Sequence, residues 1–243
     1  MVTSSEGKTK TKASNIISEA LKKGQKTLSE YQSKLLLAEY EIPVVPEKLV
    51  SSSKDACDAA EEIGYPVVLK ACGPDISHKT ERGLVLVGLK RPEEVKEAFQ
   101  NITERLQNDE WEGILVQSMV KGERELVIGL VRDPQFGPCV MFGLGGIFTE
   151  ILRDVSFRVA PIEKEDALSM MQEIRAKAIL GPVRGMPPAD TEILAKALVE
   201  LGRIGVEHEN VSEIDVNPMI IGPQGMPCAV DALVVLGEKQ ASM

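Results

Sequence analysis

One change of pattern constrains the fold of this chain more than any other feature. Up to Val120, helix-forming segments alternate with short apolar strands, an order typical of parallel strands. After Gly122 the strands follow one another through tight turns, first through RDPQFG, as in a β-meander. We therefore expect an α+β fold of two lobes with a cleft between them. The expected ranges are 1–26 for an N-terminal arm, 27–118 for the first lobe and 119–243 for the second.

The N-terminal arm combines two patterns. Residues 1–12 are rich in Ser, Thr and Lys, which predicts a mobile segment. Residues 13–23 have the spacing of a short amphipathic helix that ends at Gly24. Thr27 and Glu30 then match a capping box, so we expect the next helix to open at Thr27.

Composition excludes several classes of protein. The 243 residues carry a formal charge of -9, which makes general binding to nucleic acid unfavourable. The sequence contains no apolar run of about eighteen residues and no signal peptide, so we expect no membrane span. The four cysteines are widely spaced, as free thiols of a reducing cytoplasm are. A cytoplasmic protein that can still hold one anionic nucleotide is the expectation.

Five segments, in a fixed order, carry a family resemblance. They are GYPVVLKA, QSMVKGERELVIGLVRDPQFGP, FGLGGIFTEILRDVSFRVAPI, RGMPPAD and EIDVNPMIIGPQGMPCAVDA. Together they resemble the ATP-grasp (beta) subunit of the NDP-forming acyl-CoA synthetases, such as ADP-forming acetate–CoA ligase. The nucleotide-binding subunit of succinyl-CoA synthetase is similar more distantly. The resemblance covers residues 27–236 and implies an ATP-grasp fold that binds ATP or ADP with Mg²⁺ in the cleft between its lobes.

The resemblance assigns the nucleotide contacts. Lys70 ends an apolar strand before a loop that contains glycine, and the resemblance implies that it contacts phosphate, although a strand-end lysine is usually a solvated cap. Gln117, Met119 and Val120 would read adenine through the backbone, and by themselves they are simply core residues. Glu125 resembles the acid that accepts hydrogen bonds from the ribose hydroxyls, against the alternative of a surface acid.

Further residues match the family's magnesium and phosphate contacts. Asn217 and Asp231 lie on two strands joined by a short turn, and the resemblance implies that they ligate Mg²⁺, which prefers oxygen ligands. Asp231 is an acid within an apolar run, and such an acid is costly to bury unless it is paired or bound to metal. Glu213 either joins the metal or lies on the surface. Arg158, which follows a glycine-rich segment, is a candidate phosphate contact.

Two residues are the candidate catalytic groups. A lone histidine in a polar loop is usually exposed and inert, but the resemblance implies that His78 is transiently phosphorylated. Gly73 and Gly83 flank this loop. Asp215, on the same side of its strand as Asn217, corresponds to an acid that orients the phosphohistidine. His208, the other histidine, is expected to be structural or exposed.

The implied reaction needs a second chain. A partner alpha subunit would bind CoA, form an acyl phosphate from acyl-CoA and phosphate, and pass the phosphoryl group through its own histidine to His78 and on to ADP. The resemblance implies an α2β2 hetero-oligomer. The sequence itself supports the need for a partner, because it contains no GxGxxG fingerprint after its first strand. Two alternatives stay open. One is another ATP-grasp carboxylate ligase that uses no phosphohistidine, and the other is a nucleotide-sensing module.

Overall fold

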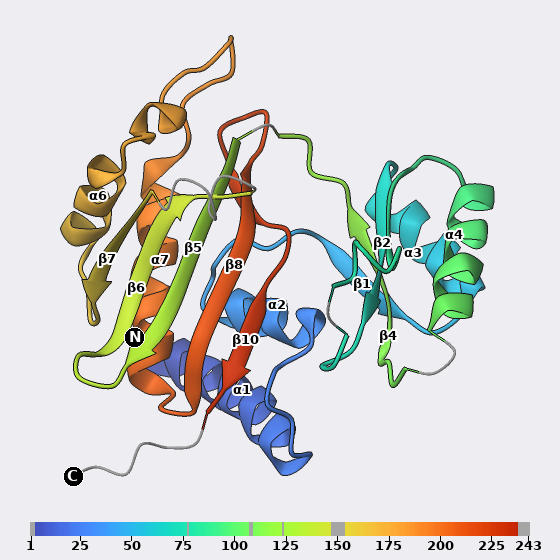
Figure 1. Ribbon diagram of the computed structural model, residues 1–243, viewed down its shortest axis with the longest axis horizontal. Helices are drawn as coiled ribbons and strands as arrows, with labels where there is room; N and C mark the ends of the chain where they lie inside the picture. Colours follow the sequence, from blue (N-terminus) through green and yellow to red (C-terminus); the bar gives the residue numbers. More distant parts are fainter. Residues whose placement is uncertain (1–2, 77, 107–108, 123, 147–153, 238–243) are drawn as a thin grey trace. The chain divides into compact units, whose positions relative to one another are not determined.

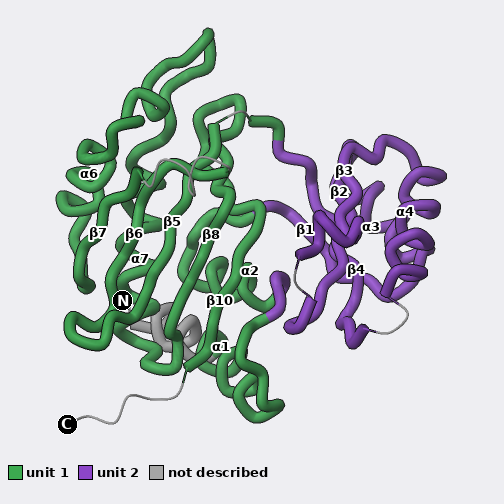
Figure 2. The backbone as a smooth tube through the Cα atoms, viewed as in Figure 1, with its two compact units in different colours: residues 1–28, 32–44, 121–243 green, residues 29–31, 45–120 purple. Residues whose placement is uncertain are grey.

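The computed structural model describes residues 3–76, 78–106, 109–122, 124–146 and 154–237. The chain divides into two compact units, which Figure 2 distinguishes by colour. Unit 1 consists of Met1–Leu28, Gln32–Val44 and Lys121–Met243, and unit 2 consists of Ser29–Tyr31 and Val45–Val120.

Unit 2 is built on a four-stranded sheet in the order β1-β4-β2-β3. Its strands are β1 (Glu47–Val50), β2 (Val67–Cys72), β3 (Val85–Leu89) and β4 (Gly113–Ser118), and its helices are α3 (Ser53–Ile63) and α4 (Pro92–Arg105). All neighbouring strands are antiparallel, so the expectation of a parallel pattern is wrong. The reason is that each helical connection skips one strand position, and an antiparallel strand fills the gap.

Unit 1 is built on a six-stranded sheet in the order β10-β8-β5-β6-β7, with β9 beside β8. The strands are β5 (Arg124–Asp133), β6 (Gly137–Leu144), β7 (Val155–Val159), β8 (Val211–Ile221), β9 (Pro227–Ala229) and β10 (Leu233–Leu236). The helices are α1 (Thr3–Lys22), α2 (Glu30–Glu39, whose first two residues belong to unit 2), α6 (Lys164–Glu173), the 3-10 turn η1 (Lys177–Leu180) and α7 (Thr191–Glu207). The antiparallel run β5-β6-β7 confirms the predicted meander.

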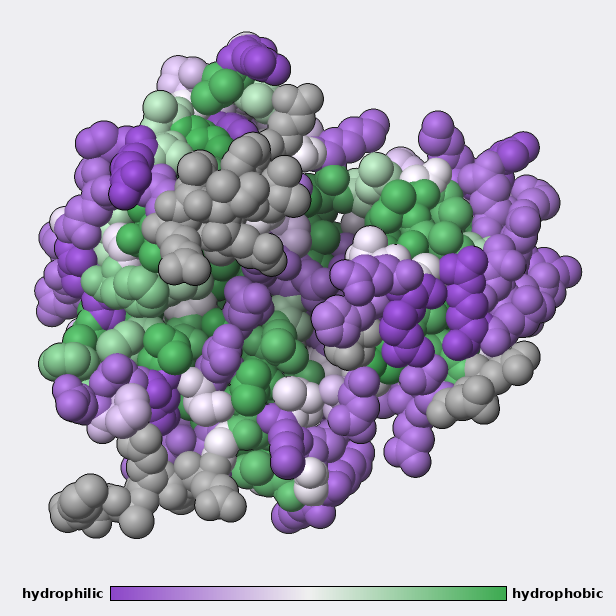
Figure 3. Space-filling model, in the orientation of Figure 1, coloured by the Kyte–Doolittle hydropathy of each residue, from purple (hydrophilic) through white to green (hydrophobic). Residues whose placement is uncertain are grey.

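The two faces of the six-stranded sheet differ. Figure 1 shows α6 and α7 behind the sheet, where Val140 and Phe142 are buried. The other face is turned to the viewer, and hydrophobic side chains show among hydrophilic ones over it in Figure 3. Exposed apolar residues of the sheet include Val131, Phe157 and Leu233. Since paired residues of antiparallel strands share a face, the row Leu233–Asp215–Gly129–Met141–Phe157 runs across this side.

The N-terminal segments differ from their expected places. Residues 32–44, expected in the first lobe, cluster with unit 1, because Leu36, Leu37 and Ile42 are buried in its core. The first helix begins at Thr3 instead of residue 13, and the side chain of Ile17 packs into the same core. Among the described residues, we find no helix with the length and apolarity needed to cross a membrane.

Candidate functional site

Strand pairing in unit 1 places the two predicted magnesium ligands opposite each other. Met219 of β8 pairs with Ala229 of β9. Antiparallel pairing runs in opposite directions along the two strands, so Asp231 lies opposite Asn217 in the same register. The pairing of β8 with β10 continues that register. The two oxygen-bearing side chains therefore start from neighbouring backbone positions, as a shared cation requires.

The glycine-rich segment after β6 passes beside this pair. The backbone N–H of Gly146 donates to Asn217 Oδ1 at 3.3 Å, and the N–H of Gly145 donates to the carbonyl of Glu125 at 2.9 Å. Gly146 has a φ of 65°, and a Cβ added to it would overlap Glu125 Oε2. Gly146 therefore lies beside both the predicted ribose acid, Glu125, and the predicted metal ligand, Asn217.

Asp215 sits in an environment that disfavours its charge. Burial raises the pKa of Asp215 to about 6, and the nearby carboxylates of Glu213 and Asp231 add to the rise. A group with such a pKa exchanges its proton close to neutral pH, which is a property of acid–base and orienting residues in active sites.

We expect Asp215 to make the free energy of unfolding depend on pH. Its folded-state pKa of about 6 lies above the ordinary 3.8, so the folded state holds a proton that the unfolded state loses, and stability falls as pH rises through that window. Asp215→Asn should remove this fall and stabilise the protein by up to about 3 kcal/mol above pH 6. Urea unfolding of both proteins from pH 4 to 7, in a chelator, measures the effect. If the free energies of unfolding of the two proteins changed with pH in the same way, the raised pKa of Asp215 would be contradicted.

Unit 2 positions Lys70 and His78. Lys70 lies on β2 with a buried side chain, and its Nζ donates to Glu30 Oε1 at 2.8 Å. His78 follows β2 in a loop, at a φ of 51°, and its side chain is 73% exposed. Backbone bonds from Arg82 N to the carbonyl of His78 (3.1 Å) and from Leu84 N to the carbonyl of Lys79 (2.7 Å) shape the loop. The imidazole is therefore open to the surroundings of its unit, and its phosphorylation stays a prediction.

The predicted adenine-reading segment is the end of unit 2. Gln117 is buried on β4, where it pairs with Val68 of β2. The N–H of Met119 donates to the carbonyl of Pro66 at 3.1 Å, and Val120 is the last residue of the unit. The chain passes from one unit to the other here, and the role of these residues in adenine binding stays a prediction.

Arg158 lies apart from the other predicted residues of unit 1. It is opposite Val140, on the face covered by helices, and its guanidinium forms an ion pair with Glu173 of α6. Its neighbour Phe157 shares the opposite face with Asp215. Because successive side chains of a strand point to opposite faces, Arg158 and Asp215 lie on different faces of the sheet. The phosphate contact of Arg158 stays a prediction.

Sequence reasoning missed Glu30. The capping-box interpretation of Thr27 and Glu30 is wrong in its starting point, because α2 begins at Glu30 and Thr27 forms an isolated β-bridge with Val235. The carboxylate of Glu30 instead pairs with Lys70 and with Lys79. An acid in a first helical turn is so common that it gave no sign of partners far along the chain.

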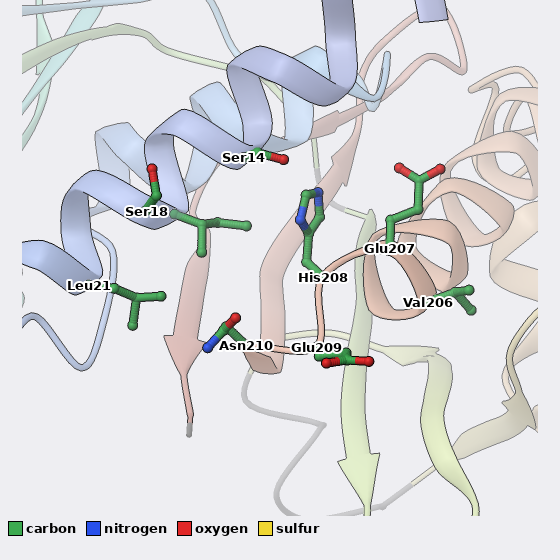
Figure 4. A pocket seen from close by; sticks show the side chains of 9 residues that line it. Ser14, Ser18, Leu21, Val206, Glu207, His208, Glu209 and Asn210 are labelled. Carbon is green, nitrogen blue, oxygen red and sulfur yellow. The ribbon is translucent and has the colours of Figure 1, made fainter. Parts of the chain in front are cut away.

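His208 has a structural setting. It caps the C-terminus of α7, and its Nε2 lies 2.8 Å from the hydroxyl of Tyr40, which also donates to Glu207 Oε2 at 2.8 Å. In Figure 4 its ring faces a pocket of about 390 Å³ between α1 and the end of α7. None of the predicted site residues lines this pocket.

Fold and site together define the class of this protein as ATP-grasp, and a family model described as an ATP-grasp domain matches residues 19–236. The beta subunit of ADP-forming acetate–CoA ligase I from Pyrococcus furiosus is 45% identical over 230 residues, which are 93% of this chain and 98% of that one. The chain therefore belongs to the family of the beta subunits of ADP-forming acetate–CoA ligases.

Two further relatives add detail. ADP-forming acetate–CoA ligase I from Archaeoglobus fulgidus is 40% identical over 231 residues, which are 94% of this chain and 33% of that protein. A solved structure of acetyl-coenzyme A synthetase 1 from Ca. Korarchaeum cryptofilum has a TM-score of 0.83 and 43% identity, and covers 93% of this chain and 100% of its own. That structure is a complex with coenzyme A and Mg-AMPPCP, with its phosphohistidine segment pointing towards the nucleotide binding site.

If Glu125 binds the ribose as predicted, Gly146→Ala should weaken nucleotide binding at least about tenfold. The added Cβ would displace Glu125, and hydrogen bonds to a charged group are worth about 1.5–3 kcal/mol each. Calorimetric titration with Mg-ADP measures the loss. Gly137→Ala is a matched control, since Gly137 has a similar φ of 77° and a Cβ there meets nothing within 4 Å. Equal affinities of the two variants would contradict the role of Glu125.

Proposed function

We propose that this chain is the nucleotide-binding beta subunit of an ADP-forming acyl-CoA ligase, with acetyl-CoA as the acyl-CoA. In this role it carries a phosphoryl group on His78 between a CoA-binding partner and ADP. The observation that carries the proposal is the exposure of His78 on a loop of an ATP-grasp chain. The similarity to beta subunits over nearly the whole of both chains supports it.

The nucleotide contacts in this proposal are those that the family motifs assign. Lys70 contacts phosphate oxygens as a point charge, Glu125 accepts hydrogen bonds from the ribose, and the backbone of residues 117–120 reads adenine. Asn217 and Asp231 would hold Mg²⁺, because they start from opposed backbone positions on β8 and beyond β9 and carry the oxygen donors that this ion prefers. Bound Mg²⁺ supplies neutralisation of the charge on the phosphate oxygens.

In the proposed reaction, the phosphoryl group passes from His78 to ADP. The terminal oxygen of ADP attacks the phosphorus on His78, the N–P bond breaks, and the imidazole leaves with the electron pair of that bond. Asp215 accepts a hydrogen bond from the ring and supports its positive charge, as carboxylates do in other His–Asp pairs. The products are ATP and free His78. Run backwards, the same step labels His78 from ATP.

A partner supplies the acyl-CoA chemistry. The Archaeoglobus relative is a single protein three times as long as the matched region, which supports a second set of domains with that task. We propose that these domains belong here to a separate alpha subunit, that the assembly is α2β2, and that it works in the cytoplasm on acyl-CoA, phosphate and ADP.

The test uses the purified chain with and without its partner. With acetyl-CoA, phosphate and the partner, mass spectrometry is expected to find one phosphoryl group on the chain, at His78, and addition of Mg-ADP should remove it as ATP. The chain alone should bind Mg-ADP but cleave no acetyl-CoA. Full cleavage by the chain alone, or ligase activity without phosphohistidine, would overturn the proposal, and the second result would favour a direct carboxylate ligase.

A further inference from the structure

Glu30 joins the two parts of unit 2 that handle phosphate in the proposed function. Its carboxylate lies at the start of α2, and its side chain is only 2% exposed. One oxygen, Oε1, accepts from Lys70 Nζ at 2.8 Å, and the other, Oε2, accepts from Lys79 Nζ. Lys70 lies on β2, the strand that leads to the loop, and Lys79 is the neighbour of His78.

The carboxylate of Glu30 balances the charges of two lysines, Lys70 and Lys79. Two ammonium groups meet one carboxylate, and the side chains of Lys70 and Lys79 are 7% and 18% exposed. Without the carboxylate, two poorly solvated positive charges would repel each other across a few ångströms. With it, each lysine is fixed to a different oxygen of one planar group, so the distance between the two ammonium groups is fixed as well.

The position of His78 depends on that connection. The His78 ring is largely exposed, and a carboxylate oxygen of Glu81 lies 3.6 Å from its Nδ1. Other anchors of the loop hold its far end, where Arg82 pairs with Asp109 at 2.6 Å and Arg105 donates to the carbonyl of Gly83 at 2.8 Å. The Lys79–Glu30 pair holds the end that carries His78.

We propose that Glu30 is a positioning residue for phosphoryl transfer, because it ties the His78 loop to the phosphate-contacting lysine through a carboxylate shared by Lys79 and Lys70. The inference rests on the proposed function. It assigns Glu30 no contact with the reacting atoms.

The test separates nucleotide binding from transfer. Lys79→Met leaves the Lys70–Glu30 pair in place and removes the ion pair between Glu30 and the His78 loop. The rate of His78 labelling by Mg-ATP, measured in single turnover, is expected to fall about a hundredfold, as misplacement of a reacting group by about 1 Å does. The affinity for Mg-ADP should stay within about twofold. Lys79→Arg, which restores the ion pair, should recover most of the rate.

A double-mutant cycle shows whether Lys79 acts through Glu30. Glu30→Gln should slow labelling, and adding Lys79→Met should slow it little further, whereas independent roles would multiply the two effects. Lys48→Met is the matched control, since it breaks an exposed ion pair with Glu62 in the same unit and should label at the normal rate. Thermal unfolding checks each variant, and Lys79→Met and Lys79→Arg decide the matter if Glu30→Gln does not fold.

Each outcome has one meaning. Normal labelling of Lys79→Met would overturn the role of Glu30 and leave the proposed function standing. Equal losses in nucleotide affinity and in transfer rate would also overturn it, because a purely structural ion pair would behave in that way. Absence of phosphohistidine from the unmodified chain, by contrast, would overturn the proposed function and the inference together.

Discussion

His78→Ala is expected to abolish phosphoryl labelling of this chain and, in the assembled enzyme, to reduce ADP-dependent acetyl-CoA cleavage to background. In the proposed function the imidazole accepts and donates the phosphoryl group, and the other histidine of the sequence, His208, lies at the end of α7 in unit 1. Acid-labile, base-stable label on the chain after incubation with Mg-ATP is the measurement. Binding of Mg-ADP should be unchanged, because the substitution leaves the nucleotide contacts intact.

His208→Ala provides the matched control, since the sequence contains two histidines. The substitution removes the hydrogen bond between the His208 ring and the Tyr40 hydroxyl. It is expected to lower the free energy of unfolding by about 1 kcal/mol. The label should persist in full. Label that survived in His78→Ala and disappeared in His208→Ala would reverse the assignment of the two residues.

Asp231→Asn is expected to weaken Mg²⁺-dependent nucleotide binding and to slow labelling of His78 by at least about a hundredfold, the scale on which loss of one charged group in a preorganised site reduces rates. Asparagine keeps the size of the side chain but removes the negative charge that holds the cation. Titration with Mg-ADP at increasing Mg²⁺ measures the shift. We expect excess Mg²⁺ to restore part of the affinity.

Asp190→Asn controls for the substitution itself. Asp190 caps α7 by accepting from the N–H groups of Glu192 and Ile193, and asparagine is an equally good cap. This variant should bind and label normally. If Asp231→Asn bound Mg-ADP as well as Asp190→Asn does, the magnesium role of Asp231 would be excluded.

Local signals in the sequence predicted the elements that depend on neighbouring residues. The turn after β5 could be predicted from its residue types. Asp133 accepts hydrogen bonds from the N–H groups of Gln135 and Phe136, and Gly137 takes a positive φ. The proximity of Asn217 and Asp231 was predictable for the same reason, since only a short turn separates their strands. The exposed His78 followed from the polar, glycine-bounded loop around it.

Features that depend on distant parts of the chain escaped prediction. The antiparallel order of unit 2 arises because β4, the last strand of the unit, inserts between β1 and β2. Glu30 is paired with Lys70 and Lys79, which follow it by 40 and 49 residues, and no helix pattern relates residues so far apart. The ion pair of Arg158 with Glu173 also escaped prediction, because it joins a strand to a helix that follows it in the chain.

The division of the chain has a consequence for the order of folding. Apart from the short segment Ser29–Tyr31, unit 2 is one continuous stretch, whereas unit 1 needs both ends of the chain. Leu28 bonds to Val234 through the backbone, and Val44 pairs with Ala229, so the core of unit 1 closes only after nearly all of the protein has left the ribosome. During synthesis, the region that carries His78 can form its native contacts while α1 and the apolar side of α2 still await the strands that will cover them.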